Sequence, residues 1–362
     1  MINNFESNKL FILNADEING IIFAIVFILT LLTLRRNEKP SNFFDRITTE
    51  QVRGIAILMV VIGHIWVHVT QISPHIVLSG DGVAIFLILS GFGIVKSLKR
   101  EPRLKQYIIN RINRVMIPYW AATVIILLLD WIFLDRLYSF SHILATLSGI
   151  NVYGIMHHFD YVRWYITFLL FWYVSVIIIY RTIHKTFWLY AMFGWGMIVF
   201  FIDYYVIKVG WYHFFAFPIG CFIAEKYNIC EKIIHSIGKK FGVLFLILAV
   251  ISVYTKYYLL DAALSNLPSI VILLINEMCG LLFALSLISF ININQLTSRF
   301  LLLCGKYSYE IFLLHGVFLI KYNPFFNLAP LPVAFIIYFL FMLALSVIMK
   351  LSLQQIKFPQ SI

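Results

Sequence analysis

The chain has 362 residues, of which 61% are hydrophobic and only 12% are charged, and its formal net charge is +11. Apolar runs of membrane-spanning length recur from end to end, so the composition excludes a soluble globular protein. The sequence predicts an all-α, polytopic transmembrane helix bundle. The excess positive charge requires no nucleic acid, because it lies between the apolar runs, where cytoplasmic loops face anionic lipid.

Hydropathy predicts eleven membrane-spanning helices. In chain order their ranges are 18–34, 52–69, 82–98, 117–134, 164–180, 187–207, 211–224, 241–260, 268–290, 307–320 and 331–351. The seventh is the shortest and could instead be a re-entrant or buried segment. With the N-terminus placed outside, 22 of the 28 Lys and Arg residues fall on the cytoplasmic side. This asymmetry follows the positive-inside rule and predicts an N-out, C-in topology.

The second predicted span contains Arg53 and His64. Eleven residues at about 100° each bring both side chains to one helix face, about 16 Å apart along the axis. Insertion of an ionisable residue into the membrane costs about 3 kcal/mol. This cost favours the interpretation that Arg53 and His64 have a function over the alternative that neighbouring helices merely satisfy them as a polar pair. His68 lies one turn beyond His64, but no acid or Cys of suitable spacing accompanies the two, so no metal site is expected.

The cytoplasmic stretch 96–115 carries seven cations and one acid. Arg111 and Arg114 precede the helix start at Pro118, and we expect them to hold the phosphates of a coenzyme A nucleotide, because guanidinium groups match phosphate oxygens. The alternative is charge that only sets the topology and contacts lipid.

Small residues gather in the third span. Gly82, Ser90, Gly91 and Gly93 are expected to allow close helix approach. Asp81 lies at the outer end of this span, where its carboxylate could be solvated and have no functional role.

The segment 305–320 contains Glu310 and His315, and both side chains have an unfavourable free energy of insertion within a span. The imidazole of His315 could help to bind an acceptor, or it could pair with Glu277, the acid near the middle of 268–290. The alternative is mutual satisfaction of buried polar groups.

The outer loop 135–163 leads to Arg163 and Trp164. Aromatic faces with polar groups suit sugars, so an acceptor is expected to enter here, past His157 and His158. An interfacial aromatic belt is the alternative.

Six blocks in this order resemble the acyltransferase 3 family. They are Arg53, ten residues and His64; FLILSGFGI at 86–94; Arg111 and Arg114 with IPYW at 117–120; WYITFLLFWY at 164–173; FFAFPIGCFIAE at 214–225; and YSYEIFLLH at 307–315. Members are integral membrane enzymes with ten core spans that O-acylate glycans at the bacterial surface. The resemblance therefore implies an added N-terminal helix and cytoplasmic linker at 1–51 and a membrane acyltransferase domain at 52–362.

Two positions depart from the family pattern. Ala84 stands where many members carry an acid after the Gly-Val pair, so the role of that acid is in doubt here. Asn110 precedes Arg111 where paired Arg residues are frequent. The chain resembles the members that lack an appended soluble esterase-like domain.

The resemblance implies an O-acetyltransferase of the bacterial plasma membrane. Acetyl would pass from cytosolic acetyl-CoA, a substrate rather than a bound cofactor, to a sugar hydroxyl of a surface or capsular polysaccharide or its lipid-linked precursor. Arg53, Arg111 and Arg114 would meet the coenzyme A phosphates. His64 would act with Arg53 in catalysis, as general base or as acetyl carrier. Contacts to the acceptor would come from Arg163, Trp164, His315 and Glu310.

Two other classes of protein remain as alternatives. A transporter or flippase of lipid-linked saccharides would share the helical bulk, but repeated halves and paired broken helices are not visible in the sequence. A membrane scaffold would not need charges inside its spans.

Overall fold

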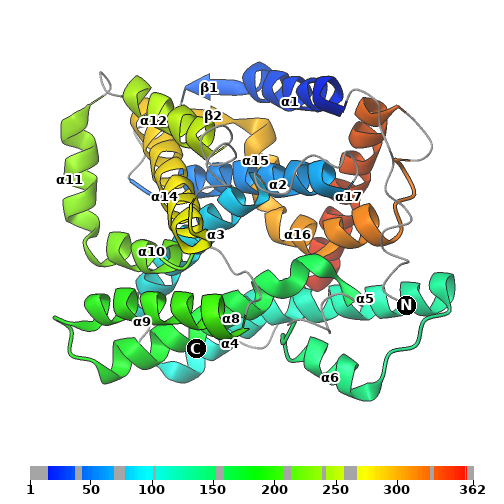
Figure 1. The fold of residues 1–362 in the computed structure, drawn as a ribbon, viewed down its shortest axis with the longest axis horizontal. Helices are drawn as coiled ribbons and strands as arrows, with labels where there is room; N and C mark the ends of the chain where they lie inside the picture. Colours follow the sequence, from blue (N-terminus) through cyan, green and yellow to red (C-terminus); the bar gives the residue numbers. More distant parts are fainter. Residues whose placement is uncertain are drawn as a thin grey trace. The chain divides into compact units, whose positions relative to one another are not determined.

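The computed structural model describes residues 15–36, 43–68, 78–100, 103–151, 159–207, 213–238, 242–256, 267–326, 330–354 and 356. The chain divides into two compact units, and each is described by itself. The first unit includes Lys96–Ile177 and Tyr309–Ile362, and the second includes Lys9–Val95 and Ile178–Ser308. The described elements are helices apart from two short strands, so the prediction of an all-α bundle is confirmed (Figure 1).

The first unit begins with one continuous helical stretch. It consists of α4 (Leu104–Arg111), the π segment η1 (Ile112–Met116) and α5 (Ile117–Leu134). The elements that follow are α6 (Phe140–Leu147), the 3-10 turn η2 (Tyr161–Arg163), α8 (Trp164–Thr182), α16 (Ser308–Gly316), the π segment η6 (Val317–Lys321) and α17 (Leu331–Leu353). Helix α17 packs against α5.

In addition to Ile178–Thr182 at the end of α8, the second unit holds the remaining elements apart from Lys96–Arg100. They are α1 (Ala15–Leu32), β1 (Leu34–Arg36), α2 (Arg46–His68), α3 (Leu78–Arg100), α9 (Trp188–Ile202), the π segment η3 (Asp203–Ile207), α10 (Ala216–Glu225), α11 (Tyr227–Ile237), α12 (Gly242–Tyr254), α14 (Ser269–Asn294), β2 (Leu296–Ser298) and α15 (Arg299–Lys306). Helix α2 packs extensively on α15, and α12 packs on α14.

Among the described residues, seven helices are long and apolar enough to cross a membrane, or eight if Arg299–Lys306 and Ser308–Lys321 count as one broken span. Three shorter apolar helices, Gly20–Leu32, Ala216–Glu225 and Gly242–Tyr254, coincide with the predicted spans 18–34, 211–224 and 241–260. The polytopic helical character is therefore confirmed. The count of eleven spans and their orientation stay predictions.

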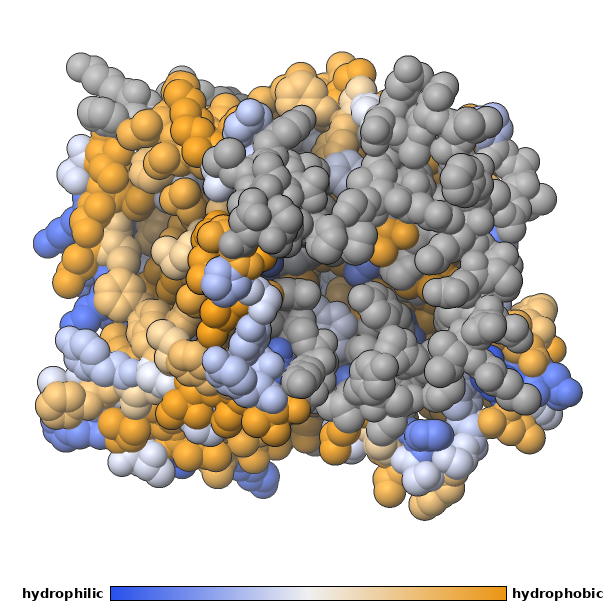
Figure 2. Space-filling view, in the orientation of Figure 1, coloured by the Kyte–Doolittle hydropathy of each residue, from blue (hydrophilic) through white to orange (hydrophobic). Residues whose placement is uncertain are grey.

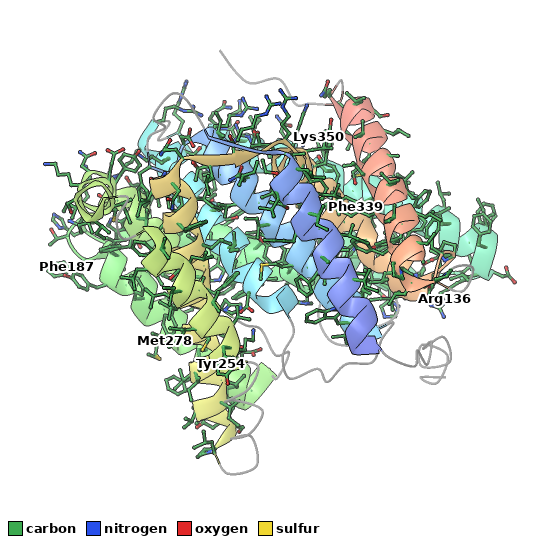
Figure 3. The ribbon with its side chains drawn as sticks, turned by 90° about the horizontal axis from the view of Figure 1, so that it is seen from above. Arg136, Phe187, Tyr254, Met278, Phe339 and Lys350 are labelled. Carbon is green, nitrogen blue, oxygen red and sulfur yellow. The ribbon has the colours of Figure 1, made fainter. Side chains whose placement is uncertain are left out.

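The surface of α12 and α14 is apolar, as expected of helices that face lipid. Leu244, Val250 and Ile251 on α12 are exposed, and Figure 2 shows apolar side chains over this part of the second unit. Figure 3 labels Tyr254 at the end of α12 and Met278 on α14, and both side chains are exposed. Because exposure of so many neighbouring apolar groups to water would be unfavourable, this surface supports a membrane environment.

Glycines bring α3 and α10 into backbone contact. A Cβ at Gly91 would lie 2.3 Å from the carbonyl oxygen of Phe217, and one at Gly220 would lie 2.1 Å from that of Ile88. Gly82 makes a similar approach to α2, so the expectation of close packing is confirmed at Gly82 and Gly91. It is wrong at Gly93, where a Cβ would meet no atom of the described residues within 4 Å.

Gly91 and Gly93 lie on the same helix, and they provide a matched test of this packing. We expect Gly91→Ala to destabilise the protein by roughly 1–3 kcal/mol, because backbone atoms of α10 would have to move. Gly93→Ala should leave stability unchanged or slightly increased, since alanine is the better helix former. Thermal unfolding of both variants in detergent measures the difference, and equal melting temperatures would contradict the close contact.

A two-stranded sheet links the N-terminal helix α1 to the rest of the second unit. Strand β1 pairs antiparallel with β2, with Leu34 opposite Ser298. The side chain of Gln51 on α2 donates to the carbonyl of Leu296 at 2.8 Å and accepts from the amide of Ser298 at 2.6 Å. The predicted boundary between residues 51 and 52 thus falls inside α2, and the two-domain division stays a prediction.

Candidate functional site

Arg53 and His64 both lie on the uninterrupted helix α2 and are half-buried, while most residues between them are buried. Val60, seven residues after Arg53 and four before His64, lies on their shared face. A Cβ at Gly82 would lie 3.0 Å from the side chain of Val60 and 2.6 Å from the carbonyl oxygen of Ala56. Helix α3 therefore packs against the face that carries the pair, between the two side chains.

In the first unit, Arg111 is held between two aromatic rings. Its guanidinium carbon lies 5.7 Å from the ring centre of Tyr107 and 5.6 Å from that of Tyr173. The Tyr107 hydroxyl donates to the Tyr173 carbonyl at 2.9 Å, which fixes α4 against α8. The Nε atom of Arg111 is buried and has no hydrogen-bond partner among the described residues. Such a group is suited to an anionic ligand, because it retains an unused donor beside stabilised positive charge.

Arg114 lies on the π segment η1, and its side chain is exposed. The hydroxyl of Tyr309, on α16, donates to the carbonyl of Val115 in the same segment at 2.9 Å. Segments of π helix often occur at functional sites, because they disturb the regular hydrogen bonding and re-aim side chains. Tyr309 thus helps to hold the turn that presents Arg114.

Arg163 is fully buried at the start of α8. Its Nε donates to Asp160 Oδ2 at 3.0 Å and its Nη1 donates to Thr123 Oγ1 at 2.5 Å. The guanidinium lies between the rings of Tyr119 and Phe159, 4.9 Å from each centre. Burial raises the pKa of Asp160, and the neighbouring Arg163 opposes that shift. The remaining nitrogen, Nη2, has no hydrogen-bond partner among the described residues and could bind an oxygen of a ligand.

Contacts to one helical stretch relate the surroundings of these two arginines within the first unit. The Tyr309 hydroxyl donates to the carbonyl of Val115, midway between Arg111 and Tyr119. Tyr173 contacts Arg111, and Tyr119 contacts Arg163. Arg111 and Tyr119 are eight residues apart on one helical stretch, which corresponds to about 12 Å.

Sequence reasoning did not assign Tyr119, Tyr173 or Tyr309 to the site. A signal was present, because all three lie inside blocks that carry the family resemblance, IPYW, WYITFLLFWY and YSYEIFLLH. The contacts of all three join segments distant in the chain, so helical periodicity alone could not reveal them.

Of the other predicted acceptor contacts, Trp164 is half-buried and packs near the rings of Tyr165 and Phe168. His315 is fully buried, with Nδ1 2.8 Å from the Phe312 carbonyl, so Nδ1 carries the proton. Glu310 is buried and lies 3.3 Å from Lys350 Nζ on α17. The structure therefore gives His315 and Glu310 partners within the first unit.

Two expectations about acids change. Asp81, whose carboxylate could have been solvated at the outer end of its span, is instead buried and accepts from Lys256 Nζ at 2.9 Å. The imidazole beside Glu277 is that of His213, 3.7 Å away, and Glu277 also accepts from the amide of Phe215 at 3.0 Å. A carboxylate inside a membrane protein needs such partners, because burial without them costs several kcal/mol.

Asp130 forms a separate and fully satisfied cluster in the first unit. Its carboxylate accepts from the hydroxyls of Tyr138 and Tyr322, each at 2.6 Å, and from Lys321. Because every group has a partner, we interpret this cluster as structural. His157 and His158 lie outside the described residues, as does the side chain of His68. No group of three or more metal-ligating side chains occurs among the residues that could be searched.

Comparison with known proteins gives one family. A family model described as an acyltransferase domain matches residues 48–351, which include every residue predicted for the site. Searches of curated proteins and of solved structures found no match. The matched range and the apolar helices together identify a membrane acyltransferase, and the chain belongs to the acyltransferase 3 family.

Proposed function

We propose that this membrane acyltransferase moves acetyl from cytosolic acetyl-CoA to a sugar hydroxyl. The acceptor is a cell-surface or capsular polysaccharide or its lipid-linked precursor, and the enzyme resides in the bacterial plasma membrane. The observation that carries the proposal is the pair of ring-held arginines, Arg111 and Arg163, which contact Tyr107 and Tyr119 of one helical stretch within one unit. Each retains a buried nitrogen without a protein partner among the described residues, as binding groups for polar ligands would.

The proposed topology has eleven spans with the N-terminus outside and the C-terminus inside. Each predicted span coincides with an apolar helix or with part of a broken span. In this topology Arg111 and Arg114 are near the cytoplasmic surface, and the guanidinium of Arg163 lies inside the bundle at the depth of Tyr119 and Thr123.

The donor is proposed to bind through Arg53, Arg111 and Arg114. Coenzyme A carries several phosphate groups, and guanidinium groups form strong, directional hydrogen bonds to their oxygens. Arg114 is exposed to cytosolic ligands, while Arg111 is stiffened by Tyr107 and Tyr173. This arrangement fits a nucleotide at the surface whose thioester extends into the bundle.

His64 is proposed as the general base. It takes the proton of the acceptor hydroxyl while the oxygen attacks the thioester carbonyl carbon. The carbon–sulfur bond then breaks, and the departing thiolate receives the proton from the imidazolium, so the products are a sugar ester and free coenzyme A. A short-lived acetyl-imidazole formed by His64 is the alternative order of steps.

The acceptor is proposed to approach through Arg163 and Trp164. The free Nη2 of Arg163 can donate to a sugar oxygen, and the half-buried indole of Trp164 offers an apolar face to a sugar ring. His315 and Glu310 were expected to contribute directly. Their protein partners favour an indirect role, in which they position α16 and its Tyr309.

The test is acetyl transfer by the purified wild-type protein. Labelled acetyl-CoA is supplied together with surface polysaccharide from which O-acyl groups have been removed by mild alkali. We expect label in the polysaccharide and release of free coenzyme A. A protein that binds polysaccharide or its lipid-linked precursor but leaves the thioester intact would instead be a transporter, and the proposal would be wrong.

A further inference from the structure

Four ionisable side chains form a buried cluster in the second unit, apart from the residues assigned above. They are Asp81 on α3, His213 just before α10, Lys256 just after α12 and Glu277 on α14, and each is at most 5% exposed. Lys256 pairs with Asp81 at 2.9 Å, and His213 lies 3.7 Å from Glu277. We name this set the buried polar cluster.

Gly280 joins the two pairs into one cluster. A Cβ on this residue would lie 2.3 Å from Cε1 of His213 and 3.1 Å from Oδ1 of Asp81. Both side chains therefore approach the same point on α14, and only glycine leaves room for them. On the other side of the imidazole, a Cβ at Gly80 would lie 3.4 Å from Nε2. The imidazole is thus enclosed by α3 and α14.

The His213 ring is fully buried, and its nearest polar neighbours are the backbone of Gly80 and the carboxylate of Glu277. Neither ring nitrogen makes a hydrogen bond of good geometry among the described residues. A buried polar atom without a partner destabilises the folded protein, because its hydrogen bonds to water are lost and not replaced. The backbone of His213 is also left-handed, with φ of 66°, a conformation that is unfavourable for a residue with a side chain. Surrounding structure must compensate for both costs, and such strained polar residues are concentrated at ligand-binding and catalytic positions.

The cluster adjoins the helix that carries the proposed catalytic pair. Asp81 immediately precedes Gly82, which packs on α2 at Ala56 and Val60. Val60 lies on the face of Arg53 and His64. A group bound at the cluster would therefore lie beside α2 within the same unit.

The charges and hydrogen-bonding groups of the cluster select its ligand. One ammonium group stands beside two carboxyl groups, so the cluster has no excess of positive charge and does not suit phosphate or another anion. A neutral imidazole offers one donor and one acceptor. A hydroxyl group matches both, because it donates and accepts, whereas a thioester oxygen can only accept.

We propose that the buried polar cluster binds a hydroxyl group of the acyl acceptor, with His213 as the contacting residue. This inference rests on the proposed function, since it assigns the acceptor side of that reaction. Glu277 and the Asp81–Lys256 pair act as positioning residues that hold the imidazole ring.

The experiment compares His213→Ala and His213→Gln with His184→Ala, a control histidine that is exposed in the same unit. Each purified variant is assayed with acetyl-CoA and alkali-deacylated polysaccharide at graded concentrations. Hydrolysis of acetyl-CoA without polysaccharide reports the donor site separately. We expect His213→Ala to raise the KM for polysaccharide about tenfold or more, as loss of one good hydrogen bond does. The KM for acetyl-CoA should stay within about twofold.

Glutamine keeps a donor and an acceptor, so His213→Gln should recover part of the affinity for polysaccharide, while His184→Ala should behave as wild type. An unchanged KM for polysaccharide in a folded His213→Ala protein would overturn the inference. Failure of both His213 variants to fold would do so too, because it would assign His213 a purely structural role. If the wild-type protein transfers no acetyl, the proposed function itself fails, and that outcome is distinguished by the wild-type assay alone.

Discussion

Replacement of His64 by alanine is expected to abolish acetyl transfer to the polysaccharide. A positioned general base contributes about 10²- to 10⁴-fold to the rate, and no other side chain on that face of α2 between Arg53 and His64 can accept a proton. The helix should fold normally, because His64 is half-buried and alanine favours helix. Mass spectrometry of the surface glycans, with immunoblots to equalise the protein level, measures the loss.

The control for this variant is His184→Ala, which removes an exposed histidine and should retain full acetylation. A second comparison uses His64→Gln, whose amide can form hydrogen bonds but cannot take up the proton. We expect both His64 variants to be inactive while they still bind acetyl-CoA. Acetylation within about twofold of wild type in either variant would refute the role of His64 as base.

Loss of the Arg163 guanidinium is expected to have the second largest effect. Arg163→Met would leave the buried Asp160 without its cation, and an uncompensated buried charge destabilises a protein by about 3–5 kcal/mol. The yield of folded protein should fall sharply. This loss alone would not identify a binding role, because folding and activity would be lost together.

A double variant separates the two effects. Asp160→Asn with Arg163→Gln replaces the ion pair by two neutral amides that can hydrogen-bond each other, so folding should largely recover. Acetyl transfer should remain about 10- to 100-fold below wild type, since the charged donor at Nη2 is gone. Recovery of full transfer in the folded double variant would show that Arg163 is structural. Arg181→Gln, which removes an exposed arginine on the same helix, provides the control.

The helical architecture could be predicted from the sequence because the bilayer permits few backbone conformations. A span must satisfy its own backbone hydrogen bonds, so a long apolar run becomes a helix whatever surrounds it. The placement of Arg53 and His64 on one face followed from helical periodicity, and α2 is indeed continuous between them. The family could also be recognised from short blocks in order, and the match over residues 48–351 confirms it.

Pairing between distant residues could not be predicted in this way. Asp81 and Lys256 are 175 positions apart, and nothing in the periodicity of either segment links them. The same holds for Tyr309 and the carbonyl of Val115, which the π segment η1 presents to it. The sequence showed only that burial of each polar group in a span is unfavourable. It did not show which partner would compensate for that burial.

The sequence by itself thus determined where helices form and which ionisable residues had to be explained. Hydrophobic burial and backbone hydrogen bonding act locally along the chain, so these features are readable from neighbouring residues. Only the tertiary structure decided that Arg163 lies between two rings, with one nitrogen that has no hydrogen-bond partner in the described part of the chain, and that His213 is enclosed beside Gly280. Those arrangements depend on contacts between helices, whose geometry arises from the close packing of side chains across the fold.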